Sequence, residues 1–137
     1  MKIMKIFLFL FYSCFLTFAV QANDTVENSF ARLSKIDRFA FGLTGYAGVI
    51  SQGEKDYRII LSGASPIERF ESLYKVGNPQ AKCYALVGIS ILRPDRFQEL
   101  VLTLKRDKTE VITQNGCFVS HMTIGEVVTQ IGDGIYK

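Results

Sequence analysis

The sequence predicts a mainly α-helical fold: a short stack of antiparallel helices, similar to a helical-repeat array, with at most one small β-hairpin and with one disulfide. Three observations predict it. Oxygen-bearing residues precede glutamates at the spacing of helix caps, all three prolines stand where helices can begin, and apolar residues repeat at helical steps. Joints of two to four residues between helices of about 10 to 14 residues favour antiparallel stacking.

The helix starts are marked by pairs in which an oxygen-bearing residue precedes a glutamate by three positions. In a capping box the two side chains satisfy backbone N–H groups that the first helical turn leaves open. Proline suits the same turn, because the N–H that it lacks would have no helical partner. The pairs are Asp24 with Glu27, Ser51 with Glu54, Ser65 with Glu68, and Thr123 with Glu126, and the prolines are Pro66, Pro79 and Pro94.

Apolar spacing extends the helical prediction through the middle of the chain. Apolar residues repeat at steps of three and four between Ile67 and Tyr74, and again between Phe97 and Leu104. The stretch between these segments, Asn78 to Leu92, is apolar almost all the way round, so we expect its helix to be central and packed on several sides. The other expected helices cover about 25–39, 52–61 and 124–131.

Two stretches lack this helical character. The segment AFGLTGYAGVIS, residues 40–51, has three glycines among small and apolar neighbours, and it predicts an irregular loop or a short strand from Tyr46 to Ile50. The segment TEVITQNGCFVSH predicts a hairpin, because Asn115-Gly116 between apolar and β-branched flanks is a strong turn signal. The glycines do not indicate a phosphate site, since neither Gly-Lys-Ser/Thr nor Gly-x-Gly-x-x-Gly occurs.

The first residues have the layout of a secretory signal peptide. Two lysines precede an apolar run from Ile6 to about Phe18, and Val20-Gln21-Ala22 suits cleavage after Ala22. The alternative is an uncleaved N-terminal anchor. With residues 1–22 removed, residues 23–137 would form a single helical domain that is periplasmic or secreted and is not inserted in a membrane.

Charge gives no reason to expect a nucleic acid or an acidic membrane as a partner. The full chain has a formal net charge of +3, and the signal peptide would take two lysines with it, which leaves a nearly neutral domain. The densest basic cluster, Lys105 to Lys108, closes a predicted helix, where cations complement the negative end of the helix dipole. No motif indicates a cofactor, and we expect none.

The sequence predicts a disulfide between Cys83 and Cys117. Cys14 would leave with the signal peptide, and an exported protein matures where thiols oxidise. Closing this loop would stabilise the fold by roughly 4 kcal/mol in the chain-entropy model. A metal site would need further ligands and a nucleophile would need a base, whereas His121 is the only histidine. Inert free thiols are the remaining alternative.

No group of residues predicts catalysis. Ser120 and His121 would face opposite sides of a strand, and no Gly-x-Ser-x-Gly elbow occurs. We therefore favour a non-enzymatic exported module, without a metal, that binds a protein or peptide through a groove between its helices. Its candidate binding residues are Tyr46, Glu54, Tyr57, Arg58 and His121, and Tyr74 and Tyr84 are further candidate anchors.

The alternative is a small secreted hydrolase or an inhibitor of an envelope enzyme. The hydrolase would need Glu54 or His121 buried in a cleft as its acid or base. The inhibitor would need a rigid, protruding loop, for which residues 41–51 are the candidate.

Two segments, AGVISQGEKDYRIIL and AKCYALVGI, resemble small exported bacterial proteins encoded near siderophore-type microcin gene clusters. They cover about a fifth of the chain. The resemblance implies a bacterial exported protein, and it carries over no catalytic or binding residue.

Overall fold

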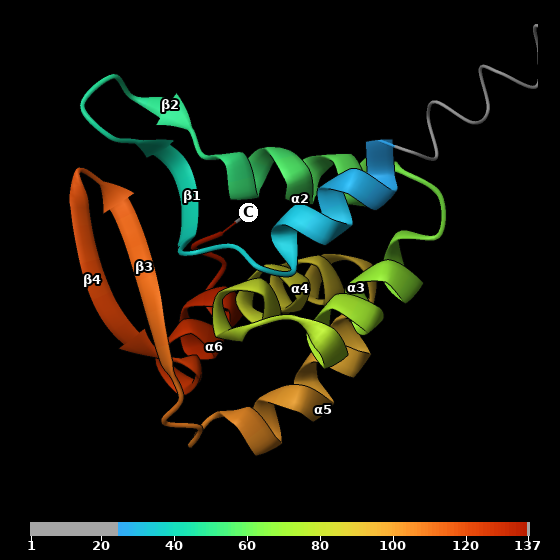
Figure 1. The fold of residues 1–137 in the computed structure, drawn as a ribbon. Helices are drawn as coiled ribbons and strands as arrows, with labels where there is room; N and C mark the ends of the chain where they lie inside the picture. The colour runs from blue at the N-terminus through green and yellow to red at the C-terminus, as the bar shows by residue number, and fades with distance from the viewer. Residues whose placement is uncertain (1–24, 137) are drawn as a thin grey trace, which may run out of the picture.

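The computed structural model describes residues 25–136, and the predicted signal peptide, its cleavage site and the Asp24 cap lie outside this range. Within it, six helices accompany a four-stranded sheet. Figure 1 shows the sheet at one side of the molecule and most of the helices at the other. The first helix covers residues 25–33, and the other elements are β1 (Phe39–Thr44), β2 (Val49–Ile50), α2 (Gln52–Ser62), α3 (Pro66–Val76), α4 (Pro79–Leu92), α5 (Pro94–Leu104), β3 (Glu110–Gly116), β4 (Phe118–Thr123) and α6 (Ile124–Gly132).

The four strands form a mixed sheet in the order β2-β1-β3-β4. β1 runs parallel to β3, with Phe39 opposite Thr113, and both outer pairs are antiparallel. The chain passes through β2 and helices α2 to α5 between these two central strands. The prediction of a mainly α-helical, repeat-like stack is therefore wrong, because the fold combines helices with a mixed sheet.

The missed strand is β1, whose first residue lies within the stretch predicted to be helical. The first helix ends near residue 33, and β1 begins at Phe39. Pairing with β3 stabilises β1, and because β3 comes much later in the chain, no local pattern reveals that partner. The expected strand from Tyr46 to Ile50 shrinks to β2, which pairs with β1 as an antiparallel hairpin. The hairpin predicted across Asn115-Gly116 forms as β3 and β4.

Most helix starts agree with the sequence. Each of the three prolines occupies the first turn of a helix. Thr123 and Glu126 form a complete capping box at the start of α6, and the Ser51 side chain accepts a hydrogen bond in the first turn of α2. Ser65 is the exception, since its backbone is left-handed at φ 51° and its side chain caps nothing.

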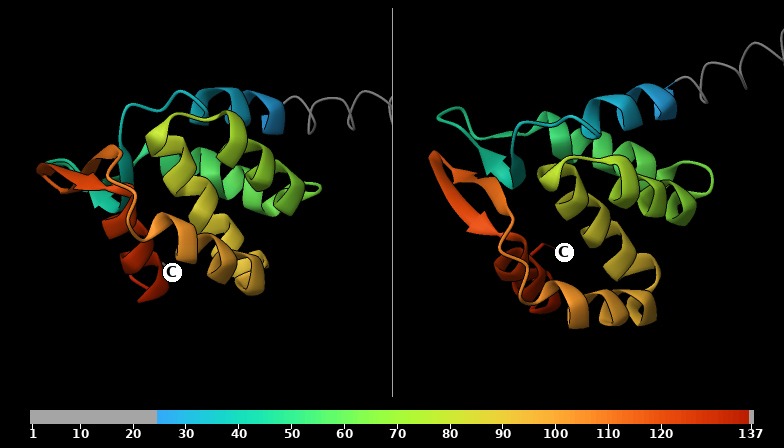
Figure 2. Two further views of the ribbon diagram at one scale, coloured as in Figure 1. Left: turned by 90° about the horizontal axis from the view of Figure 1, so that it is seen from below. Right: turned by 60° about the horizontal axis from the view of Figure 1, so that its bottom comes forward.

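Helix α4 is the central helix, as the sequence predicted. It contacts α2, α3, α5 and α6 as well as β1 and β3 (Figure 2). Cys83, Tyr84 and Leu86 on this helix are completely buried. A Cβ at Gly88 would meet the Phe70 ring at 2.4 Å, so glycine allows α3 to pack closely against α4.

The predicted disulfide is wrong. Cys83 is buried in α4, whereas Cys117 is exposed in the turn between β3 and β4, and the two thiols are free and do not lie near each other. Burial raises the pKa of the Cys83 thiol to about 12, with a further contribution from the charge of Asp107, so this thiol stays protonated. Export allows oxidation, but a bridge also needs Cα atoms within about 7 Å, which composition does not reveal.

Candidate binding site

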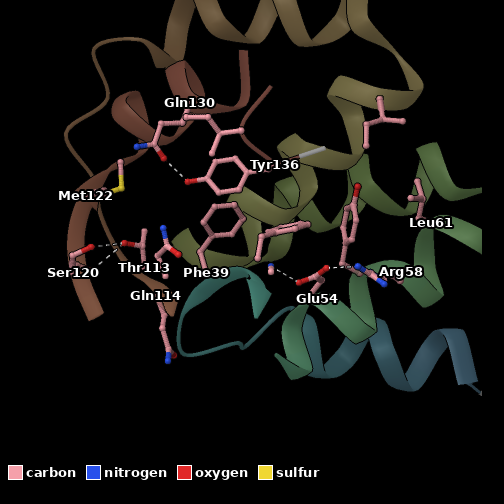
Figure 3. A pocket seen from close by; sticks show the side chains of 16 residues that line it. Phe39, Glu54, Arg58, Leu61, Thr113, Gln114, Ser120, Met122, Gln130 and Tyr136 are labelled. Atoms are coloured by element: carbon pink, nitrogen blue, oxygen red, sulfur yellow. Dashed lines mark hydrogen bonds and ion pairs between the residues drawn. The ribbon is translucent and has the colours of Figure 1, made fainter. Parts of the chain in front are cut away.

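A pocket of about 770 Å³ lies between the sheet, helix α2 and the last described residues of the chain. Small-ligand sites occupy about 300 to 1,000 Å³, so this pocket can hold a ligand of that kind. Figure 3 shows Phe39 and Tyr136 near its middle, with Met122 toward one end and the Glu54–Arg58 pair toward the other. We call it the aromatic pocket, and its apolar wall includes Phe39, Phe41, Tyr57, Leu61, Met122 and Tyr136.

Four aromatic rings form the floor of the aromatic pocket. Phe39 and Phe41 are two residues apart on β1, and alternation along a strand puts both on the same face of the sheet. The ring of Phe39 lies 4.9 Å from that of Tyr136, and the ring of Phe41 lies 5.2 Å from that of Tyr57, both with edge-to-face geometry. This geometry is favourable for aromatic pairs, so the floor is an apolar surface of packed rings.

Glu54 is a buried carboxylate at one end of the aromatic pocket, with a side chain only 4% exposed. One of its oxygens accepts a 2.7 Å hydrogen bond from the backbone N–H of Gly42, which has a left-handed φ of 78°. The other accepts a 2.6 Å charge-assisted bond from the Arg58 guanidinium. Both oxygens are therefore occupied, and the carboxylate fastens β1 to the first turn of α2.

The start of α2 explains why Glu54 lies here. The Ser51 hydroxyl accepts the Glu54 N–H at 3.1 Å and donates to the Ala40 carbonyl at 2.9 Å. The cap thus holds the helix against β1, and the Glu54 side chain turns to Gly42 instead of closing a capping box with Ser51.

Tyr57 carries the unsatisfied polar atom of this site. Its residue is 4% exposed, and its hydroxyl has no hydrogen-bond partner within residues 25–136. Burial raises the pKa of Tyr57 to about 12, and the negative charge of Glu54 adds to this shift while Arg58 opposes it. The hydroxyl is therefore a neutral O–H donor at physiological pH. Leaving such a group unpaired costs about 1 to 3 kcal/mol.

Polar groups at the other end of the aromatic pocket are paired with each other. The hydroxyls of Thr113 and Ser120, on neighbouring strands, lie 2.9 Å apart. The Tyr136 hydroxyl donates to the side-chain oxygen of Gln130 on α6. Burial raises the pKa of Tyr136 to about 12, so it also stays protonated. These pairs leave Tyr57 as the unpartnered hydroxyl of the pocket among the described residues.

The structure brings together three of the five candidate binding residues and separates the other two. Glu54, Tyr57 and Arg58 lie on adjacent turns of α2 and all line the aromatic pocket. Tyr46 is fully exposed in the turn between β1 and β2. His121 is exposed on β4, where its Nδ1 lies 2.6 Å from a Glu110 carboxylate oxygen.

The two further candidate anchors lie outside the pocket wall. Tyr84 is buried in α4, where its hydroxyl donates to the Ala40 carbonyl and accepts from the Ala40 N–H. Tyr74 is partly buried in α3. The cavity therefore lies between the sheet and α2, instead of in the groove between helices that the sequence suggested.

The sequence analysis did not identify the pocket residues on the sheet or those near the end of the described chain. Phe39, Phe41, Gln130 and Tyr136 were not candidates, although each lines the cavity. The alternation Phe39-Ala40-Phe41 was a signal that could have indicated a strand with one aromatic face. Tyr136 had no such signal, because only the folded chain brings it to Phe39.

The arrangement suits binding better than bond breaking. The Ser120 hydroxyl is engaged with Thr113, and His121 does not line the pocket, so these residues do not form a nucleophile and base pair. Within residues 25–136, no three His, Cys, Asp or Glu side chains gather in a way that could hold a metal ion. In the same range no helix combines the length and hydrophobicity needed to cross a bilayer.

No protein-family model matches this chain, and no curated protein matches it in sequence. The function must therefore be inferred from the geometry of the site.

Proposed function

We propose that this protein is an exported, non-enzymatic binding module that holds an apolar segment of a peptide or protein partner in the aromatic pocket. The observation that carries this proposal is a cavity of about 770 Å³ with a floor of aromatic rings, in which the hydroxyls of Thr113, Ser120 and Tyr136 are already paired. Such a cavity gains free energy mainly by removing apolar surface of a ligand from water.

Exposed apolar side chains beside the pocket favour a partner larger than the cavity. Leu43 and Val49 on the first hairpin are 65% and 56% exposed, and Phe118 on the second is 82% exposed. The Gly45 N–H donates to the Gly116 carbonyl at 2.9 Å, which fastens the two hairpin tips side by side (Figure 1). Gly42 and Asn115 line the pocket next to these tips, so one partner can contact both the aromatic pocket and the exposed apolar side chains of the hairpins.

A peptide-display selection on the purified protein tests this proposal. Selected peptides should share apolar residues, and their affinity should fall about tenfold or more for Ile91→Trp, which adds bulk to the pocket wall. Leu102→Trp is the matched control, since Leu102 is 83% exposed on α5 and does not line the pocket. Selection of no binders, or equal affinity for both variants, would contradict the proposal.

Inhibition of an envelope enzyme is the second candidate function, and one observation favours it. The turn between β1 and β2 protrudes (Figure 1), and Tyr46 in this turn is fully exposed, as an inhibitory loop would require. Tyr46→Ala should then abolish inhibition of a target enzyme while leaving peptide binding in the pocket intact. The hydrolase alternative gains less support, because both Glu54 oxygens are occupied and His121 lies outside the pocket.

The resemblance to microcin-associated exported proteins stays a prediction. It is compatible with an exported binding module, and it supplies no residue for the site.

A further inference from the structure

We propose that the two hairpin tips bind a lipid surface, into which their exposed apolar side chains insert. The tips are residues 43–49, at the turn between β1 and β2, and residues 116–119, at the turn between β3 and β4. Such a contact is peripheral, because it buries side chains only about 5 to 10 Å deep in the boundary between headgroups and acyl chains. The inference goes beyond the proposed binding function and does not depend on a ligand in the aromatic pocket.

The tips form one exposed apolar patch. Figures 1 and 2 show both turns projecting from the same side of the molecule. Large exposed apolar patches on folded proteins mark sites that contact another protein or a membrane. The side chains of this patch are the fully exposed Tyr46 and four that are each more than half exposed, Leu43, Val49, Phe118 and Val119.

The second hairpin exposes apolar side chains on both of its faces. Ser120 and Met122 line the aromatic pocket, and Phe118 lies on the same face of β4, because side chains two residues apart on a strand share a face. Val119 is the next residue and therefore lies on the opposite face. A peptide held in the aromatic pocket can cover Phe118, but it does not reach Val119.

The first hairpin shows the same arrangement. Val49 pairs with Thr44, the neighbour of Leu43, so Leu43 and Val49 lie on opposite faces of this hairpin. A single protein partner covers one face of a projecting tip, whereas a lipid surface surrounds the tip on all sides. The distribution of the apolar side chains therefore favours lipid.

The absence of charge at the tips favours lipid as well. Residues 39–53 and 111–125 contain no Asp, Glu, Lys or Arg. Charged groups at protein interfaces are arranged so that they complement the partner, and edge strands are often protected from other strands by lysine. The tips offer neither of these features, and they can enter a bilayer without removing a charge from water.

Several polar groups of the tips are already bonded inside the protein. The Gly116 carbonyl accepts from the Gly45 N–H at 2.9 Å and from the Gln114 side chain at 3.1 Å. The Thr44 hydroxyl donates to the Val49 carbonyl at 2.9 Å. Internal pairing of this kind lowers the cost of leaving water, because lipid supplies no partners for backbone groups.

The positions of the exposed side chains agree with a shallow contact. Leu43 and Val49 each lie three residues from Tyr46, and a strand rises about 3.3 Å per residue, so the apolar part of the first tip is about 10 Å deep. Tyrosine is enriched where bilayers meet water, because its ring is apolar and its hydroxyl is polar. The depth therefore matches the layer that peripheral segments enter.

Tryptophan fluorescence with phosphatidylcholine vesicles tests the inference. The chain contains no tryptophan, so Tyr46→Trp reports on the first tip alone. Vesicles should shift its emission to shorter wavelength, and brominated phosphatidylcholine should quench it. Leu102→Trp is the matched control, since Leu102 is also exposed but lies on α5. Its emission should not change, even if residues 1–24 bind lipid.

Vesicle sedimentation of variants assigns the binding to the tips. Leu43→Ser and Phe118→Ser should each weaken partition into vesicles about tenfold, because each removes an apolar side chain from the contact. Leu102→Ser should leave partition unchanged, and thermal melting confirms that each variant is folded. Partition should be equal at low and high salt, because the tips carry no basic residue.

Three outcomes would overturn the inference: no spectral change of Tyr46→Trp with vesicles, equal quenching of Tyr46→Trp and Leu102→Trp, or partition that Phe118→Ser leaves unchanged. A dimer that Phe118→Ser separates in ultracentrifugation, without vesicle binding, would also overturn it and assign the tips to a second copy of the chain. None of these outcomes affects the proposed binding function, which is tested by peptide selection and Ile91→Trp.

Discussion

Two buried tyrosines, Tyr84 and Tyr57, lie with ring centroids 6.2 Å apart and have opposite hydrogen-bonding states. The Tyr84 hydroxyl donates to the Ala40 carbonyl at 2.8 Å and accepts from the Ala40 N–H at 3.0 Å. The Tyr57 hydroxyl has no partner within residues 25–136. The Tyr84 hydroxyl therefore contributes hydrogen bonds that stabilise the fold, whereas the Tyr57 hydroxyl is buried without a partner among the described residues.

The largest expected effect is on the Tyr84 side. In Gly53→Ala the new methyl group would meet the Tyr84 hydroxyl at 2.4 Å. Overpacking of this kind should lower the free energy of unfolding by about 2 kcal/mol in urea denaturation. Gly132→Ala is the matched control, because nothing lies within 4 Å of a Cβ at that position. Equal stability of the two variants would show that Tyr84 is not tightly held.

Tyr84→Phe should cost somewhat less. It removes both hydrogen bonds to Ala40 and leaves the ring in place, so we expect a loss of about 1.5 kcal/mol in the same measurement. A loss near zero would mean that the hydroxyl of Tyr84 is as dispensable to the fold as that of Tyr57, and the contrast between the two regions would disappear.

The ionisation of Tyr57 at alkaline pH gives another test of the contrast between the two tyrosines, because it should lower the stability of the protein. An unfolded tyrosine ionises near pH 10, whereas burial raises the pKa of Tyr57 to about 12. Between these values the unfolded state binds fewer protons, so the contribution of Tyr57 to stability is fully present below pH 10 and is lost as the pH rises to 12. Wild type should lose on the order of 1 kcal/mol more than Tyr57→Phe between pH 9 and pH 11 in urea denaturation. Parallel losses in the two proteins would contradict this expectation.

The two thiols extend the comparison to the buried core and the exposed hairpin tip. In the native protein, alkylation followed by peptide mapping should modify Cys117 and leave Cys83 unmodified, because Cys83 is buried and its thiol is protonated. A reducing agent should not change the melting temperature. A peptide that links Cys83 to Cys117 would contradict the structure.

The helices could be predicted because their signals are local. A proline in a first turn, or Thr123 three residues before Glu126, acts within one turn of the chain. The β3–β4 hairpin was predicted from its Asn-Gly turn, but the mixed sheet was not, because β1 pairs with β3, which lies far away in the sequence. The disulfide was predicted from the cellular compartment and the number of cysteines, and neither determines the distance between two cysteines.

Only the part of the candidate site that lies on helix α2 was predicted from the sequence. Glu54, Tyr57 and Arg58 occupy neighbouring turns of α2, so a prediction of that helix already groups them. Gly42 donates to Glu54 from a strand, and Tyr136 packs on Phe39 from the end of the described chain. Only the folded structure brings these two residues to the pocket. That the Tyr57 hydroxyl has no partner among the described residues is also a property of the folded chain, which no sequence pattern reveals.

The stability of Tyr57→Phe, measured beside that of Tyr84→Phe, tests the contrast between the two tyrosines most directly. For Tyr57→Phe we expect a free energy of unfolding that is unchanged or about 1 kcal/mol higher, because the substitution removes an unpaired buried hydroxyl. A stability loss like that of Tyr84→Phe would show that the Tyr57 hydroxyl serves the fold and would contradict the contrast.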